Sequence, residues 1–276
     1  MKEKRAVKKI VVILLIAAFG ITLTAYATLN NKDLSVHSDT RPKPVWMPAP
    51  ERLGQPPRDA IILDASQWLP DGKKTKGNKI KWKVAKDENG IEYMEVVKKT
   101  GYIHTKKVFG NCQLHIEWKI PAKVKDSGQG RGNSGIFFMG EYELQVLDSY
   151  RNPVYADGQA ASIYGQVPPL VNVCRKPGQW QSYDVSFLRP IFATDGKVIR
   201  PARITAFHNG VVVHNNYEIR GSTHHKKVTR YKPHGEKAPL QLQDHGNPVA
   251  YRNIWIRELP EEVPSCYPYI KKPGEK

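Results

Sequence analysis

A regular alternation of apolar and polar residues is the feature that most limits the folds open to this chain. From residue 112 to residue 120 every second side chain is apolar and those between are polar. Side chains of a β-strand point alternately to the two faces of a sheet, so this pattern predicts a strand with one face on a core. Shorter runs that we expect to form strands are 91–97, 136–147, 183–187, 203–208, 211–214, 240–243 and 253–257.

Turn signals separate these runs, and we find no apolar residues with helical spacing beyond residue 27. The dipeptide Asn209-Gly210, between two of the runs, is typical of a type I′ hairpin turn. Many short strands with Gly, Pro and Asn between them predict an all-β fold, a sandwich of two antiparallel sheets or a jelly roll. No internal repeat is visible, which disfavours a propeller.

The first 27 residues have the parts of a secretory signal peptide. Basic residues precede an apolar run over 10–23, and Ala25-Tyr26-Ala27 is a small-x-small cleavage site. Cleavage after Ala27 predicts an exported protein, periplasmic or extracellular. The alternative is an uncleaved membrane anchor, because residues 10–27 approach the length of a short spanning helix.

Proline content sets the expected domain boundary. Six prolines lie between residues 41 and 57, and such a stretch favours an extended linker over a helix or a central strand. We therefore predict a linker over 28–57, one globular domain over 58–262 and a basic tail over 263–276. A chain of 276 residues is long enough to bury a core without disulfides.

The charge and the cysteines exclude some classes of protein. The chain has 43 Lys plus Arg against 26 Asp plus Glu, a net charge of +17. A positive charge of this size is common in proteins that bind nucleic acid. The basic residues are scattered, and exported proteins rarely meet nucleic acid, so we expect no such partner. Three cysteines without metal-ligand spacing form neither a disulfide framework nor a metal site.

Acidic and amide side chains interrupt the apolar segment 142–148. Its residues 142, 144 and 146 share one face, which leaves Glu143 and Gln145 on the other, and a bulge near Leu147 would add Asp148. Paired carboxylates of similar spacing divide acid and nucleophile roles in sandwich-fold glycoside hydrolases, although Gln145 stands where those enzymes have a carboxylate. The alternative for Glu143 is a solvated position on an outer strand.

A second polar face is predicted in residues 240–247. The two leucines point to the core, which leaves Gln241, Gln243 and His245 in a row on the opposite face. Amides and an imidazole suit sugar hydroxyls. His245, which follows Asp244, is also a candidate general acid or base, or a structural histidine.

Two loops carry further candidates. The glycine-rich segment 128–135 lacks the Gly-Lys-Ser ending and the following helix of a phosphate loop, so we expect a rim loop that presents Arg131 and Asn133. Residues 174–180 place Lys176 and Trp180 beside a predicted turn. We expect this segment either to form a wall of the substrate site or to be a turn that packs the Trp180 indole into the core.

Other chemistries lack candidates. His224, His225 and His234 are spaced too irregularly for a structural zinc site, and we expect them to be loop residues. The chain has no Gly-x-Ser-x-Gly motif and no plausible Cys-His pair, so nucleophilic acyl transfer has no candidate.

Several segments, in order from about residue 60 to Glu258, resemble the 3-keto-disaccharide hydrolase family. They include Tyr142-Glu-Leu-Gln-Val-Leu-Asp-Ser-Tyr150, Arg175-Lys-Pro-Gly-Gln-Trp-Gln181 and Pro239-Leu-Gln-Leu-Gln-Asp-His-Gly-Asn-Pro248, with shorter matches at 132–137, 155–159, 163–166, 168–172 and 201–204. The resemblance implies a concanavalin A-like jelly-roll sandwich of two antiparallel sheets, with a substrate groove on the concave sheet.

The resemblance also implies cleavage of glycosides that a separate sugar 3-dehydrogenase has oxidised at C3. This chemistry requires a base for the C2 proton, a stabiliser for the enolate and an acid for the leaving group. We assign the base to Glu143 or His245, and leave Asp148 and Asp244 as acid or orienting partners. The residues expected to bind substrate are Arg131, Asn133, Gln145, Lys176, Gln243 and Asp244. A divalent cation held by carboxylates and His245 is an alternative stabiliser, and no other cofactor is implied.

Two other functions stay open at this point. A non-catalytic carbohydrate-binding module is one, because lectins share the sandwich and a fold does not define a function. An endo-glycosidase acting on unoxidised polysaccharide is the other, and Gln145 within the acidic motif counts against it.

Overall fold

The computed structural model of the chain describes residues 54–71, 79–225, 227 and 229–261. The predicted signal peptide, the basic tail, Cys266 and most of the predicted linker lie outside these residues. In this described part, no helix has the length and apolar content that a membrane crossing requires.

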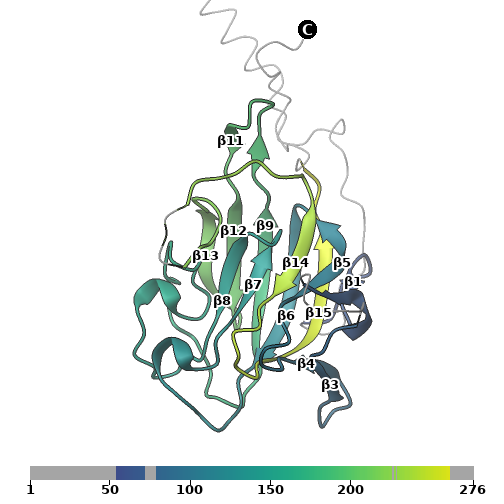
Figure 1. The fold of residues 1–276 in the computed structure, drawn as a ribbon, viewed down its shortest axis with the longest axis vertical. Helices are drawn as coiled ribbons and strands as arrows, with labels where there is room; N and C mark the ends of the chain where they lie inside the picture. The colour runs from purple at the N-terminus through teal and green to yellow at the C-terminus, as the bar shows by residue number, and fades with distance from the viewer. Residues whose placement is uncertain (1–53, 72–78, 226, 228, 262–276) are drawn as a thin grey trace, which may run out of the picture. The chain divides into compact units, whose positions relative to one another are not determined.

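The larger sheet has eight strands, all paired antiparallel, in the order β13-β12-β9-β6-β15-β4-β3, with β1 beside β15 (Figure 1). Its strands are β1 (Ile61–Ile62), β3 (Lys83–Lys86), β4 (Glu92–Glu95), β6 (Cys112–Lys119), β9 (Gln181–Leu188), β12 (Arg203–His208), β13 (Val211–Glu218) and β15 (Ala250–Glu258).

The second sheet has five antiparallel strands in the order β2-β5-β14-β7-β8. Its strands are β2 (Trp68–Pro70), β5 (Ile103–Phe109), β7 (Ser134–Phe138), β8 (Tyr142–Val146) and β14 (Ala238–Leu242). A small ribbon joins β10 (Ile191–Phe192) to β11 (Val198–Arg200), and three 3-10 turns lie at η1 (Ala65–Gln67), η2 (Gly128–Gly130) and η3 (Ala156–Gly158). The predicted all-β sandwich of two antiparallel sheets is confirmed.

The two sheets pack through their apolar faces. Leu114, Ile116 and Trp118 of β6 are fully buried, as are Leu144 and Val146 of β8. These residues are two apart along each strand, so the polar residues between them face away from the core. The alternation that predicted the strands therefore also decides which side chains reach the outer faces.

Aromatic contacts hold β8 and its neighbour β7 against the larger sheet. Phe138 of β7 stacks on Phe187 of β9 with ring centroids 4.8 Å apart. The hydroxyl of Tyr183 on β9 donates to the Gln145 carbonyl of β8 at 2.9 Å. Such buried contacts fix the backbone from which Gln145 and its neighbours project outward.

The predicted type I′ turn is confirmed, and one predicted strand is wrong. Asn209 and Gly210 both have positive φ, 51° and 82°, as a type I′ turn requires, and they join β12 to β13. The run 136–147 is a hairpin of two strands instead of one, with its turn around Gly140 at a φ of 69°. Both strands are buried throughout, so apolar periodicity did not mark the turn.

A buried histidine with two carboxylate partners lies on the outer face of the larger sheet. Nδ1 of His115 is 2.6 Å from Asp184 Oδ1, and Nε2 is 3.7 Å from Glu117 Oε1. Burial lowers the pKa of His115, but the hydrogen bonds and charges of both carboxylates outweigh it and raise the pKa from 6.5 to about 9. The histidine is therefore a cation at neutral pH.

Replacing His115 with Gln is expected to lower the free energy of unfolding by about 1–3 kcal/mol at pH 6. Because the folded pKa is raised, the stabilisation is complete below pH 6.5 and is lost as the pH rises through about 9. Urea unfolding of both proteins at pH 6 and at pH 10 measures this. His104→Gln is the control, since the ring of His104 faces the Thr105 carbonyl. A loss that is equal at both pH values would contradict the ion-pair role.

Candidate functional site

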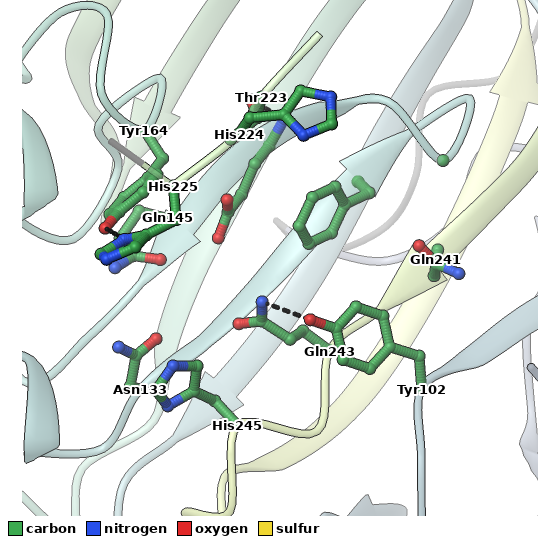
Figure 2. Close-up of a pocket in the computed structure, with 13 residues that line it drawn as sticks. Tyr102, Asn133, Gln145, Tyr164, Thr223, His224, His225, Gln241, Gln243 and His245 are labelled. Carbon is green, nitrogen blue, oxygen red and sulfur yellow. Dashed lines mark hydrogen bonds between the residues drawn. The ribbon is translucent and has the colours of Figure 1, made fainter. Parts of the chain in front are cut away.

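A polar pocket of about 450 Å³ lies on the face of the five-stranded sheet that points away from the core (Figure 2). Strands β7, β8 and β14 form its floor, and the segments around Tyr164 and around His224 form a wall (Figure 2). Its lining residues are Tyr102, Asn133, Phe137, Gly140, Glu143, Gln145, Tyr164, Thr223, His224, His225, Gln241, Gln243 and His245.

Hydrogen bonds attach the wall to the start of β8. The amide of Thr223 donates to the Glu141 carbonyl at 2.8 Å, and the amide of Glu143 donates to the Thr223 hydroxyl at 3.1 Å. The amide of Tyr164 donates to the Glu143 carbonyl at 3.3 Å. The segments that cover Glu143 are thus bound to its own backbone.

Glu143 is a carboxyl group with little access to water. Its side chain is 5% exposed. Burial raises the pKa of Glu143 from 4.5 to about 8, and the described residues supply no charge that lowers it. With its NH2 group facing acceptors, the Gln145 amide donates to Glu143 Oε1 at 3.1 Å. Glu143 is therefore mostly neutral at pH 7 and, when ionised, is a stronger base than an ordinary carboxylate.

A glycine on the neighbouring strand leaves room for this carboxyl group. Gly135 of β7 pairs with Gln145 of β8. A Cβ atom added at Gly135 would lie 2.4 Å from Glu143 Oε1 and 2.9 Å from the ring of Phe137. Any side chain at this position would displace Glu143.

An amide and a phenol form a pair on the other side of the pocket. Nε2 of Gln243 donates to the hydroxyl oxygen of Tyr102 at 2.8 Å (Figure 2). The Gln243 side chain is 9% exposed, and its Oε1 is buried without a hydrogen-bond partner in the described structure. Buried acceptors normally have a donor, so this oxygen marks a place for a ligand group.

Tyr164, His224 and His225 line both this pocket and an adjoining cavity. The Tyr164 hydroxyl lies 2.7 Å from the Tyr155 hydroxyl and 3.0 Å from Nδ1 of His225. Burial, followed by the hydrogen bond with Tyr155, raises the pKa of Tyr164 above its usual range. The adjoining cavity has a volume of about 510 Å³.

Six of the residues proposed from the sequence meet in this pocket. They are Glu143, Gln145, Asn133, Gln241, Gln243 and His245. The predicted row of Gln241, Gln243 and His245 lines one side of it, and Glu143 and Gln145 project from β8 as expected.

Asp148 and Arg131 lie elsewhere. They form a buried ion pair of 2.7 Å and line a separate cavity of about 500 Å³. Strand β8 ends at Val146 with regular pairing, and Asp148 turns away, its amide bonded to the Arg131 carbonyl. The expected bulge does not form, and Asp148 does not share a face with Glu143.

Asp244 and Lys176 also lie outside the lining of the pocket. The Asp244 carboxylate accepts hydrogen bonds from the amides of Thr100, Gly101 and Gly246 at 2.8–3.0 Å, so it holds two loops together. Lys176 is exposed in the loop before β9.

Several lining residues were not proposed from the sequence. Tyr102, Phe137, Tyr164 and Thr223 come from segments without a chemical motif. His224 and His225 were expected to be loop residues, and they lie outside the named strands, but they also face the pocket. The one signal in the sequence that could have indicated them is that the two histidines are adjacent.

The pocket does not have the donor set of a typical divalent-cation site. Among the described residues, no three His, Cys, Asp or Glu side chains gather to hold a metal. Glu143 is the one carboxylate among the lining residues, and amides surround it. These lining residues therefore do not fit a bound divalent cation.

The fold and the site define a β-sandwich protein with a polar, amide-rich pocket on one sheet. The family model described as a 3-keto-alpha-glucoside-1,2-lyase-like domain matches residues 64–257, and the chain belongs to this family. No match was found among curated proteins.

Two solved structures from Parabacteroides distasonis, each described as a candidate glycosyl hydrolase, are similar to the chain. The first is 40% identical, with 82% of this chain and 96% of that chain covered and a TM-score of 0.72. The second is 20% identical, with 71% and 91% covered and a TM-score of 0.47. The family and the first structure support a protein that acts on or binds glycosides.

Gly135→Ala is expected to destabilise the protein by about 1–3 kcal/mol, because the added methyl group overlaps Glu143 and Phe137. Urea unfolding measures the effect. Gly235→Ala is the matched control, since its Cβ would lie an ordinary 3.7 Å from its nearest neighbour, the Lys237 carbonyl oxygen. Equal stability of the two variants would show that the space beside Glu143 is not restricted.

The two carboxyl groups of the 142–148 segment are expected to respond oppositely to amide substitution. Asp148→Asn leaves Arg131 without its partner and should cost about 3–5 kcal/mol. Glu143→Gln removes a buried acid whose raised pKa makes the wild-type protein lose stability as the pH rises from 4.5 to about 8. Relative to wild type, Glu143→Gln should therefore gain stability over that range. Chemical unfolding at pH 5 and pH 8 tests both, and a pH-independent difference for Glu143→Gln would contradict the burial of an ionisable acid.

Proposed function

We propose that the chain is an exported enzyme that cleaves 3-keto-glycosides by elimination at C1 followed by hydration. The observation that carries this proposal is Glu143, a buried carboxyl group with a pKa near 8 in a pocket otherwise lined by amides, phenols and imidazoles. A base of this strength matches removal of a carbon-bound proton beside a ketone.

The proposed reaction has two stages, an elimination at C1 and the addition of water. A base removes the C2 proton, the electron pair of that bond forms C2=C3, and the carbonyl pair moves to oxygen to give an enolate. As the carbonyl re-forms, the pair shifts to C1=C2 and the C1–O bond breaks, so the leaving oxygen takes that bonding pair and a proton. Water then adds at C1 and a proton at C2, which gives the 3-keto sugar and the free leaving group.

Glu143 is assigned as the base. Its pKa of about 8 keeps a fraction ionised at neutral pH and makes that fraction more basic than an ordinary carboxylate. His245, exposed at the rim of the pocket, is assigned as the acid for the leaving oxygen. The amides of Asn133, Gln145 and Gln241 are assigned to the sugar hydroxyls.

A glycosidase with two catalytic carboxylates fits this pocket less well. Such enzymes place two carboxyl groups on either side of the scissile bond. Among the lining residues Glu143 is the one carboxylate, and Asp148 is paired with Arg131 in a different cavity. This arrangement favours the elimination over direct displacement. The upstream sugar 3-dehydrogenase and the periplasmic or extracellular location stay predictions from the sequence.

The purified domain is expected to release 4-nitrophenol from the 3-keto form of 4-nitrophenyl glucoside and not from its unoxidised parent. Glu143→Gln should lower kcat/KM by about 10²–10⁴-fold, because the base is lost. The wild-type rate should rise with pH and level off above about 8, as the carboxyl group of Glu143 ionises. Glu141→Gln is the control, since Glu141 is near the pocket but does not line it.

Release from the unoxidised parent by wild type, or full activity of Glu143→Gln, would overturn this proposal. Chelator is expected to leave the rate unchanged, because the lining residues do not form a metal-binding set. Loss of activity with chelator would show that a metal ion takes part, and that Glu143 alone does not account for the proton transfer.

A further inference from the structure

The enolate oxygen in the proposed reaction needs a donor, and the pocket has no lysine or arginine to supply one. None of the described residues that line it is Lys or Arg. Arg131 is paired with Asp148, and Lys176 is exposed outside the lining. With His245 assigned to the leaving oxygen, a hydrogen-bond donor of another kind is needed at the oxygen on which charge develops.

Tyr102 has a hydroxyl proton that its known partner does not use. In the Tyr102–Gln243 hydrogen bond, the amide is the donor and the phenol oxygen is the acceptor. The phenol proton is therefore available to another acceptor. Burial raises the pKa of Tyr102, so the group keeps this proton at neutral pH.

Gln243 presents the complementary group beside it. With Nε2 directed to Tyr102, Oε1 remains buried and without a donor. The pair thus offers one hydrogen-bond donor and one acceptor, on the two sides of the Gln243 amide nitrogen, to whatever enters the pocket (Figure 2). A ketone next to a hydroxyl group is the complementary arrangement, because its carbonyl accepts and its hydroxyl donates.

The second tyrosine of the pocket is less suited to this role. The Tyr164 hydroxyl already lies within hydrogen-bond distance of two groups, the Tyr155 hydroxyl and Nδ1 of His225. Its proton therefore has partners within the protein.

Building on the proposed function, we propose that Tyr102 donates its hydrogen bond to the C3 oxygen of the oxidised sugar and to the enolate formed from it, while Gln243 Oε1 accepts from a hydroxyl on a neighbouring carbon. The phenol proton stays on Tyr102 throughout, and the electron pair that moves onto the C3 oxygen returns when the leaving group departs. The Tyr102–Gln243 pair thus selects α-hydroxyketones, and Tyr102 is a catalytic residue.

Two rates separate this role from its alternatives. The first is exchange of the C2 proton of methyl 3-ketoglucoside in D2O, followed by NMR, which reports enolate formation. The second is release of 4-nitrophenol from the 3-keto form of 4-nitrophenyl glucoside. Tyr102→Phe should lower both by a similar factor, about 10–10³-fold, with the larger part in kcat. Tyr93→Phe, on the outer face of the larger sheet, is the matched control and should change neither rate.

Gln243→Met supplies a second, independent variant. It removes the donor that orients Tyr102 and the acceptor for the neighbouring hydroxyl, so KM should rise and kcat should fall together. Circular dichroism and thermal unfolding of each variant identify those that remain folded. If Tyr102→Phe is unfolded, the rates measured for folded Gln243→Met test the role proposed for the pair.

The outcomes are distinct. Exchange at the wild-type rate with slowed cleavage would make Tyr102 an acid for the leaving group and would overturn the enolate role. Wild-type values of both rates in Tyr102→Phe, or in folded Gln243→Met, would also overturn it, while the proposed function would stand. A wild-type protein that neither exchanges the C2 proton nor releases the phenol would overturn the proposed function itself.

Discussion

The apolar inner face of β8 packs against the eight-stranded sheet, and the pocket depends on that packing. Leu144 and Val146 are fully buried between the sheets. Because side chains alternate along a strand, Glu143 and Gln145 must project from the opposite face. A slip of one residue in the pairing of β8 with β7 would turn the carboxyl group into the core, which the buried apolar residues prevent.

Burial on the second face gives Glu143 its chemistry. The segments that contain Tyr164 and Thr223 are hydrogen-bonded to the backbone of Glu143, and they exclude water from its carboxyl group. A strand residue on an uncovered sheet face would keep an ordinary pKa. Covering the strand on both sides raises the pKa toward the range in which a carboxyl group exchanges protons near neutral pH.

The positive charge of the chain is not concentrated in the pocket. Arg131 pairs with Asp148, and Arg252 pairs with Glu117. Besides Phe137, Gly140 and Thr223, the lining is made of amides, phenols, imidazoles and one carboxyl group. Such a lining suits a neutral, hydroxyl-rich ligand better than an anion. The same composition makes hydrogen bonds, instead of a fixed cation, the means of stabilising a developing charge, which is the basis for the role of Tyr102.

The amino-acid sequence by itself determined several strands, β6, β9 and β12 among them, the Asn209-Gly210 turn and the outward faces of Glu143 and Gln243, because these follow from local periodicity and turn chemistry. Only the tertiary structure decided which polar residues meet. Asp148 is five residues from Glu143 and yet pairs with Arg131, whereas Tyr102 lies 141 residues from Gln243 and bonds to it. Long-range strand pairing sets those neighbours, and the loops that desolvate Glu143 are also distant in sequence. Neither effect leaves a periodic signal along the chain.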